Sequence, residues 1–76
     1  MKEFIESAVR ALAEHPDRVR LAELDGEKTL VFEVRCHPDD VGKIVGKGGK
    51  TITALRVLAT AMAHRTGRRT LIEVVQ

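Results

Sequence analysis

A nine-residue segment constrains this chain more than any other part of it, because three glycines and two lysines lie between apolar positions of helical character. The segment is Ile44-Val45-Gly46-Lys47-Gly48-Gly49-Lys50-Thr51-Ile52. Glycine has no Cβ, so the loop can take positive φ angles and lets another chain approach its backbone closely. The first amides of the following helix lack acceptors within that helix and favour an anion. The segment predicts two helices joined by a tight basic turn that holds a phosphate-bearing chain.

The charge is distributed unevenly along the sequence. Residues 1–40 carry six basic and ten acidic side chains, whereas residues 41–72 carry seven basic side chains and no acidic one. The net charge is only +2, so its position says more than its sum. A positive field centred on the glycine loop favours an anionic polymer as the partner.

The length of 76 residues predicts one domain that spans residues 1–76. A chain of this size buries only about 60% of the surface that its unfolded form exposes, which leaves little room for an enclosed active-site cavity. The lone cysteine, Cys36, excludes an internal disulfide and fits a reducing compartment. The first residues lack the apolar segment of a signal peptide, and no apolar run approaches the roughly 20 residues that span a membrane. We therefore expect a soluble cytoplasmic protein without a membrane anchor.

The first half of the chain reads as a helix followed by a β-hairpin. Apolar residues recur at helical spacing over residues 2–14, and His15-Pro16 should end that helix. Residues 18–24 predict a strand, and Asp25-Gly26 predicts a tight turn, because both residues tolerate positive φ. The next strand alternates clearly, with one face expected in the core: Leu30, Phe32, Val34 and Cys36.

The second half reads as two helices and a final strand. His37-Pro38-Asp39-Asp40 predicts a helix start, with acidic side chains that complement the helix dipole, and Gly46 should end this short helix. Residues 50–65 predict the longest helix, and residues 70–75 the last strand. A polar stripe on the long helix is expected at Thr53, Arg56, Thr60 and His64. The opposite side should face the core through Ile52, Leu55, Leu58, Ala59, Met62 and Ala63.

The element order α-β-β-α-α-β predicts an α+β fold. The hairpin makes the first two strands antiparallel, and the helical crossover should bring the third strand back parallel to one of them. The economical arrangement is a three-stranded mixed sheet covered on one face by three helices.

Two tightly connected helices joined by Gly-x-x-Gly, within the pattern Ile-Val-Gly-x-x-Gly-x-x-Ile at residues 44–52, resemble the signature of a KH domain. The additional helix and strand before the motif are similar to the type II arrangement. The resemblance covers essentially the whole chain and is strongest to the bacterial single-KH proteins of the KhpA type.

This resemblance implies a non-enzymatic protein that binds single-stranded RNA, as an RNA chaperone or post-transcriptional regulator. About four nucleotides would lie in a groove beside the loop, which clamps the RNA backbone. Single-stranded DNA is an alternative ligand. The expected RNA-binding residues are Gly46, Lys47, Gly48, Gly49, Lys50, Lys43, Val45 and Arg56.

Two apolar residues of the motif have competing roles. Val45 and Ile52 are candidate walls for bases or sugars, or ordinary core residues; the core role is favoured for Ile52. The chain has no Trp or Tyr, and both Phe4 and Phe32 belong to apolar faces. Domains that stack bases on aromatic platforms would be poorly served by this composition, whereas a KH groove needs no aromatic side chain.

Val57 and Ala61 extend the apolar arc of the long helix beyond what one core contact requires. Either the first helix covers them, or they form a partner surface. A contact between two copies of this helix would make a dimer and bring two RNA grooves together. The resemblance implies self-association or pairing with a second KH-containing protein.

Other functions are less compatible with the sequence. Gly49-Lys50-Thr51 imitates part of a P-loop, but Ile44 stands where the first P-loop glycine belongs, and a P-loop follows a strand rather than a helix. The histidines have no spacing suited to a metal, and Cys36 reads as a small core residue. We expect no catalytic residue, cofactor or metal. The alternative from another functional class is a dimerisation or adaptor domain with residual RNA binding.

Overall fold

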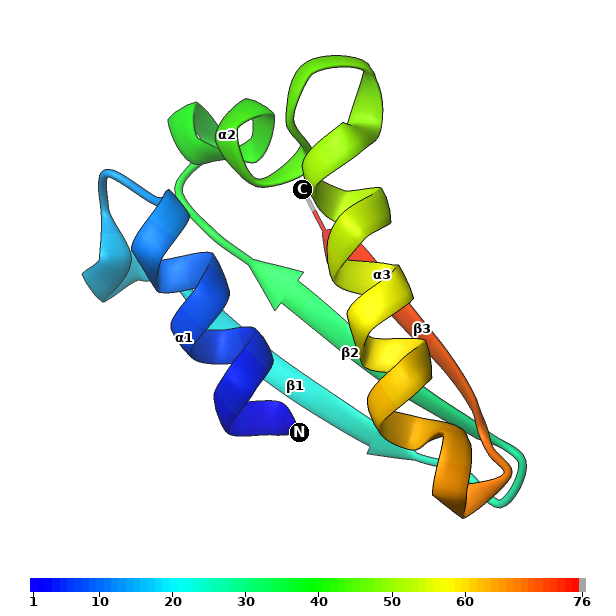
Figure 1. Cartoon of the computed structure of the whole chain (residues 1–76). Helices are drawn as coiled ribbons and strands as arrows, with labels where there is room; N and C mark the ends of the chain where they lie inside the picture. The colour runs from blue at the N-terminus through cyan, green and yellow to red at the C-terminus, as the bar shows by residue number, and fades with distance from the viewer. Residues whose placement is uncertain (76) are drawn as a thin grey trace.

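The computed structural model describes residues 1–75 and confirms the predicted element order and α+β class. Three helices, three strands and four short 3₁₀ turns (η1–η4) follow one another in this part of the chain (Figure 1). The elements are α1 (Lys2–Leu12), η1 (Pro16–Arg18), β1 (Arg20–Asp25), β2 (Thr29–Arg35), η2 (Pro38–Asp40), α2 (Val41–Val45), η3 (Lys47–Gly49), α3 (Lys50–Ala63), η4 (His64–Thr66) and β3 (Arg69–Val75).

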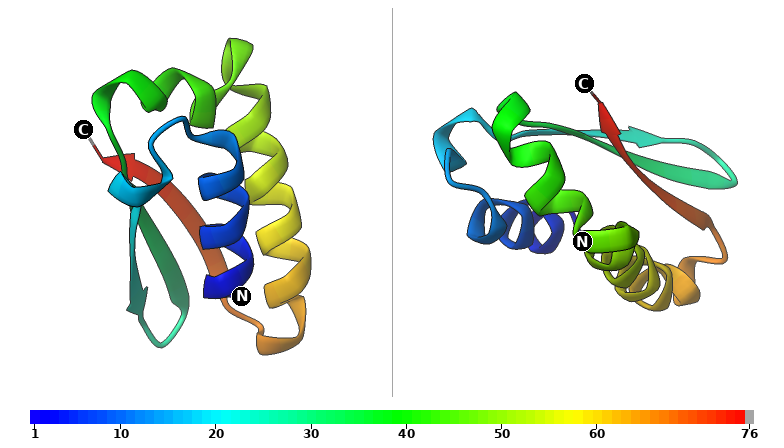
Figure 2. Two further views of the ribbon diagram at one scale, coloured as in Figure 1. Left: turned by 90° about the vertical axis from the view of Figure 1, so that its left-hand side faces the viewer. Right: turned by 90° about the horizontal axis from the view of Figure 1, so that it is seen from above.

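The sheet has the strand order β1-β2-β3 and is mixed, as expected. β1 and β2 are antiparallel, with a register that runs from the pair Arg20–Arg35 to the pair Asp25–Leu30. β3 is parallel to β2, because the α2–α3 crossover carries the chain back to the other end of the sheet. The helices lie on one face of the sheet, with α1 over β1 and α3 along β3 (Figure 2).

The hairpin exists, but the predicted position of its turn is wrong. Asp25 is the last residue of β1, and the Gly26 N–H donates to the Thr29 carbonyl at 2.9 Å, so the chain reverses at Glu27 and Lys28. Gly26 is absent from the glycines with positive φ. A Cβ on Gly26 would lie 2.8 Å from the Thr29 oxygen. Glycine is therefore needed here for close approach of two backbones rather than for an unusual φ.

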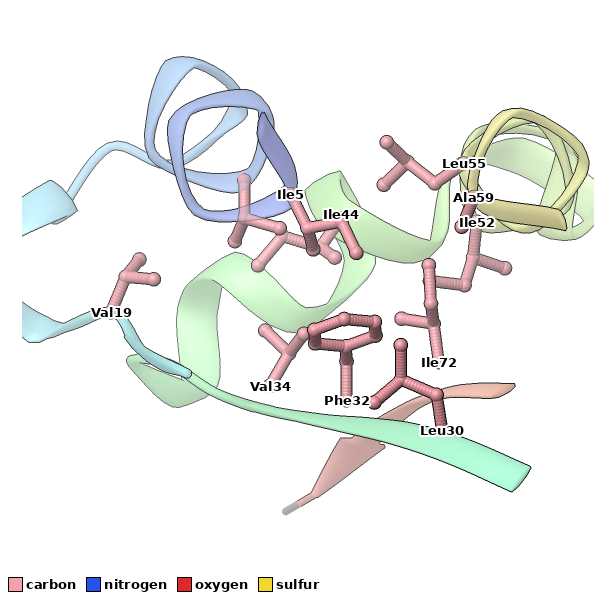
Figure 3. Close-up of a cluster of buried hydrophobic side chains, with 11 residues drawn as sticks. Ile5, Val19, Leu30, Phe32, Val34, Ile44, Ile52, Leu55, Ala59 and Ile72 are labelled. Atoms are coloured by element: carbon pink, nitrogen blue, oxygen red, sulfur yellow. The ribbon is translucent and has the colours of Figure 1, made fainter. Parts of the chain in front are cut away.

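The core forms between the helical layer and the covered face of the sheet. Figure 3 shows side chains from both layers converging around Phe32, which is fully buried. β2 contributes the alternate residues that the sequence predicts, and Cys36 packs at the edge of the core. The buried apolar residues are Ile5, Val9, Val19, Leu30, Phe32, Val34, Ile44, Ile52, Leu55, Ala59, Ala63 and Ile72.

Two predictions about the core are wrong. Leu58 and Met62 were predicted to face the core, but they are 49% and 47% exposed. The buried residues of α3 form a narrower stripe than predicted, because the helix packs along β3 and α1 stands over β1. On α1, Ile5 and Val9 point inward, and Phe4, on the apolar face of this helix, is partly exposed. The helical layer consequently presents apolar side chains to the outside.

Candidate nucleic-acid interface

The glycine segment folds as the predicted tight connection between two helices. α2 ends at Val45, and Gly46 (φ 80°, ψ 167°) turns the chain out of the helix. Gly48 and Gly49 also have positive φ, of 64° and 77°, and α3 begins directly afterwards at Lys50. In Figure 1 this loop projects at the end of the molecule where α2 meets α3.

The three glycines meet different physical requirements. A Cβ on Gly46 would lie 2.2 Å from Thr51 Oγ1 and 2.8 Å from the Thr51 nitrogen, so this position packs too closely for any side chain. A Cβ on Gly48 or Gly49 would meet nothing within 4 Å. At these two positions glycine provides the left-handed backbone, and it leaves that backbone uncovered on its outer side.

The amides at the start of α3 are less available than the sequence suggests. The Gly49 N–H donates to the Gly46 carbonyl at 3.0 Å, and the Lys50 N–H donates to the Lys47 carbonyl. These two bonds hold the loop in shape, but they occupy amides that the sequence predicted to be free for a phosphate. An anion at this loop would therefore depend mainly on the lysine side chains and on close approach to Gly48.

The loop lysines differ from the lysine that precedes them. Lys47 and Lys50 are exposed, and within residues 1–75 neither forms an ion pair. Lys43 Nζ lies 3.6 Å from Glu14 Oε1, in an exposed pair that contributes little to stability. Of these three lysines, the two in the loop are thus the ones whose charge no ion pair neutralises.

Arg56 lies two turns along α3 and is held in place by β3. Its Nε and Nη2 donate to the Ile72 carbonyl at 3.2 and 3.0 Å. A guanidinium has five N–H donors, so those outside these two bonds are free for a ligand. No sequence pattern indicated this contact, because it joins residues on two different elements.

The two apolar candidates have separate positions. Ile52 is buried in the core, as favoured from the sequence. Val45 is only partly buried and packs against the core from the end of α2. Val45 therefore retains a surface beside the loop.

Asp40 holds the start of α2 in place beneath the loop region, by bonding the end of α1. The sequence did not identify it as a functional position. Its buried carboxylate accepts hydrogen bonds from the Glu14 N–H (3.1 Å), the His15 N–H (2.9 Å) and His15 Nδ1 (3.2 Å). Burial opposes its ionisation, but these donors outweigh burial and hold the pKa of Asp40 below its ordinary value. The carboxylate makes no capping hydrogen bond to its own helix, although it stands at the start of α2 as the sequence predicts.

The Asp40 contacts connect the end of α1 to the start of α2. They also show why α1 does not continue through residue 14, since the amides of Glu14 and His15 donate to the carboxylate instead of to helical carbonyls. Beside them, the rings of His15 and His37 stack with centroids 4.1 Å apart. α2, and the loop at its end, are thereby held against the N-terminal helix.

Val57 and Ala61 are not covered by α1. Val57 is 63% exposed, and Ala61 is also exposed. With Leu58 and Met62 they form an apolar surface on α3, which we call the α3 patch. Of the two explanations left open by the sequence, cover by the first helix is wrong.

The geometry also bears on the other candidate sites. The loop follows α2 rather than a strand, in agreement with the rejection of a P-loop. Within residues 1–75 no group of three or more side chains is placed to hold a metal ion. Burial and the nearby Asp40 raise the pKa of the Cys36 thiol, which makes it less reactive. Among the helices that the structure describes, none has the length and apolar character to cross a membrane.

Comparison with known proteins gives a consistent result. The family model described as KhpA/KhpB, KH domain, matches residues 2–74. The chain is 41% identical over 75 residues to the RNA-binding protein KhpA of Halalkalibacterium halodurans, with 99% of each chain covered. It is 37% identical over 76 residues to the RNA-binding protein KhpA of Aquifex aeolicus, and the matched region covers 100% of this chain and 96% of the relative. No solved structure matches significantly.

Proposed function

The chain belongs to the KhpA/KhpB family of KH domains, and we propose that it is a non-enzymatic protein that binds single-stranded RNA at the loop between α2 and α3. The observation that carries the proposed site is the uncovered backbone at Gly48 and Gly49, flanked by the unpaired side chains of Lys47 and Lys50. Relatives over the full length are named RNA-binding proteins, and the family is a nucleic-acid-binding rather than an enzyme family. These findings favour RNA binding over an adaptor with residual RNA binding.

The proposed clamp acts on the RNA backbone rather than on the bases. Because Gly48 has no side chain, a phosphate can approach the loop closely, and the two lysines supply positive charge on either side. About four nucleotides would then lie beside the loop and the first turns of α3. Val45 offers an apolar surface near the loop, and Arg56 offers a positioned guanidinium further along. Lys43 contributes charge from the last turn of α2.

We propose that the protein works as an RNA chaperone or post-transcriptional regulator in the cytoplasm. A backbone clamp of a few nucleotides binds weakly and with little sequence preference, which suits contact with many transcripts. The same clamp can accept single-stranded DNA, and the 2′-hydroxyl would decide between the two ligands.

We further propose that the α3 patch pairs two KH domains, either in a homodimer or with a second KH-containing protein. Val57, Leu58 and Met62 are 63%, 49% and 47% exposed on adjacent turns, an arrangement that favours a helix-to-helix contact. A dimer would bring two clamps onto one RNA and raise avidity by about 10² to 10⁴-fold. Val57→Asp should convert a dimer to a monomer in light scattering, whereas Ser7→Asp, at an exposed position of α1, should not.

The clamp is tested by fluorescence anisotropy with labelled single-stranded RNA in a salt series. Lys47→Asp/Gly48→Asp should lower affinity at least about 100-fold, equivalent to about 2.7 kcal/mol, because two acids replace the proposed phosphate contact. Lys47→Asn/Gly48→Asn is the matched control. It has nearly the same side-chain shape and the same backbone strain at Gly48, but no negative charge.

The control separates charge from folding. The Asn variant should lose less affinity than the Asp variant, and circular dichroism should show both folded. Wild-type affinity in the folded Asp variant would disprove the clamp. No RNA binding by the folded wild-type protein would instead favour the adaptor function.

A further inference from the structure

The face of the sheet that points away from the helices is not covered by any element of residues 1–75. Figure 2 shows the helices on one side of the sheet and none on the other. Along β2 and β3, buried residues alternate with exposed or half-buried ones, so the latter point away from the core. Residues of β1 that pair with outward residues of β2 share their face.

An apolar row crosses the middle of this uncovered face. Leu24 pairs with Val31, and Val31 pairs with Leu71, so each strand contributes one side chain. Leu24 and Leu71 are 52% and 39% exposed, and Val31 is half-buried between them. The other large apolar side chains that are exposed in the described chain lie on α1 and α3. We call Leu24, Val31 and Leu71 the apolar row.

Charges of opposite sign lie on the two sides of the apolar row. Arg69 precedes Leu71 by two residues, and Glu73 follows it by two, beside its β2 pair Glu33. None of the three charged side chains has an ion-pair partner in residues 1–75. Arg69 and Glu73 lie roughly 13 Å apart along the strand, which is too far for them to pair with each other. Two acids on adjacent strands repel each other unless a basic group approaches them.

This pattern is complementary to itself in one orientation. If a second copy is turned about a two-fold axis that follows the apolar row, the row meets its own counterpart, and the strands of the two sheets run antiparallel. Arg69 of each copy then faces Glu73 of the other, so the ion pair forms twice. An axis parallel to the strands would instead set Glu33 against Glu33. The charges therefore select the first orientation.

We propose that the uncovered sheet face is a contact between two copies of this chain, which pack sheet against sheet in this antiparallel orientation. The contact is separate from the α3 patch, which lies on the helical layer, and it does not depend on the RNA clamp. A three-stranded face is small, so we expect a weak contact, with a dissociation constant on the order of 100 µM. A copy that used both the sheet face and the α3 patch would have two neighbours.

The test is an exchange of charges, measured by sedimentation equilibrium on protein freed of nucleic acid. All variants carry Val57→Asp, which removes the proposed α3 contact. Arg69→Glu and Glu73→Arg each place like charges opposite one another, so each alone should associate at least about tenfold more weakly than the Val57→Asp parent. In an equimolar mixture of the two, every acidic side chain at these positions meets a basic one. The mixture should therefore associate within about threefold of the parent.

A matched pair of variants controls for net charge. Lys2→Glu and Glu3→Lys make the same two changes in charge at exposed positions of α1. Each of these variants, and their mixture, should associate within about twofold of the parent, because general attraction between unlike net charges is screened and weak. Circular dichroism checks that every variant is folded.

The outcomes decide the proposal without reference to RNA. A parent that stays monomeric up to about 1 mM would overturn it. It would also fail if Arg69→Glu and Glu73→Arg associated like the parent, or if their mixture did not recover. None of these results would affect the loop clamp, which Lys47→Asp/Gly48→Asp tests separately.

Discussion

The loop between α2 and α3 and the turn between β1 and β2 both contain glycine and lie at opposite ends of α3. At the hairpin, the Thr29 carbonyl oxygen occupies the space that a Cβ on Gly26 would need, so the protein itself fills that space. In the loop, Gly46 is similarly packed against Thr51, but the space beside Gly48 and Gly49 is empty. The comparison shows that glycine can serve packing or leave backbone open for a ligand, and that only the surroundings distinguish the two uses.

The largest expected effect on stability is at the packed glycine of the loop. Gly46→Ala should lower the free energy of unfolding by about 3 kcal/mol or more, because the new Cβ overlaps Thr51 and the backbone conformation is almost restricted to glycine. Urea denaturation measures the change. Gly48→Ala, which meets no neighbour, should cost only about 1 to 2 kcal/mol. Similar losses at both positions would contradict the distinction between packed and open glycines.

A smaller effect is expected at the hairpin. Gly26→Ala should destabilise the protein by about 1 to 3 kcal/mol, because the new Cβ overlaps the Thr29 backbone oxygen and forces a backbone shift, while φ is ordinary. Affinity for an RNA of about four nucleotides should not change, because the turn lies at the other end of α3 from the loop. A loss of short-RNA binding in the folded variant would show that the two ends are coupled.

Arg56 lies between the two regions and should have an intermediate role in binding. Arg56→Glu should weaken RNA binding about fivefold, equivalent to about 1 kcal/mol, which is less than the loop variant loses. Arg56→Gln is the control for the lost contact with the Ile72 carbonyl, because it removes the charge without reversing it. If Arg56→Glu were the most damaging change, the centre of the RNA footprint would move from the loop to the middle of α3.

The last prediction concerns the dependence of stability on acid pH, which involves Asp40 at the loop end of the molecule. The folded pKa of Asp40 is below its ordinary value of 3.8, so its contribution to stability is complete above that pH. As the pH falls below 3.8, the unfolded chain takes up the proton first, and the contribution is lost through the lower folded pKa. Chemical denaturation from pH 5 to pH 2 should show this loss.

Asp40→Asn provides the comparison for the acid dependence. The variant should be less stable than wild type at neutral pH, and the difference between the two proteins should shrink as the pH falls. A constant difference across this range would show that the hydrogen bonds from Glu14 and His15 do not depend on the charge of Asp40.

Much of the fold follows from local sequence. The alternation in β2, the spacing in α1 and the glycines that stop α2 predict their elements, because each signal involves residues only a few positions apart. The hairpin was predicted two residues early, since Asp25-Gly26 suits a positive-φ turn and only the contact with Thr29 shows another use of the glycine. Leu58 and Met62 were misplaced because periodicity gives the direction of an apolar face but not the width that its neighbours cover.

The sequence by itself determined the element order, the glycine loop and the concentration of positive charge after residue 40. These properties depend on backbone preferences and composition, which act locally. Only the tertiary structure decided that Arg56 bonds the Ile72 carbonyl, that Asp40 binds the end of α1, and that Lys28 lies beside Arg69. Those contacts join residues 16 to 41 positions apart. They arise because burying one shared core fixes where distant segments meet, and no short-range pattern encodes that position.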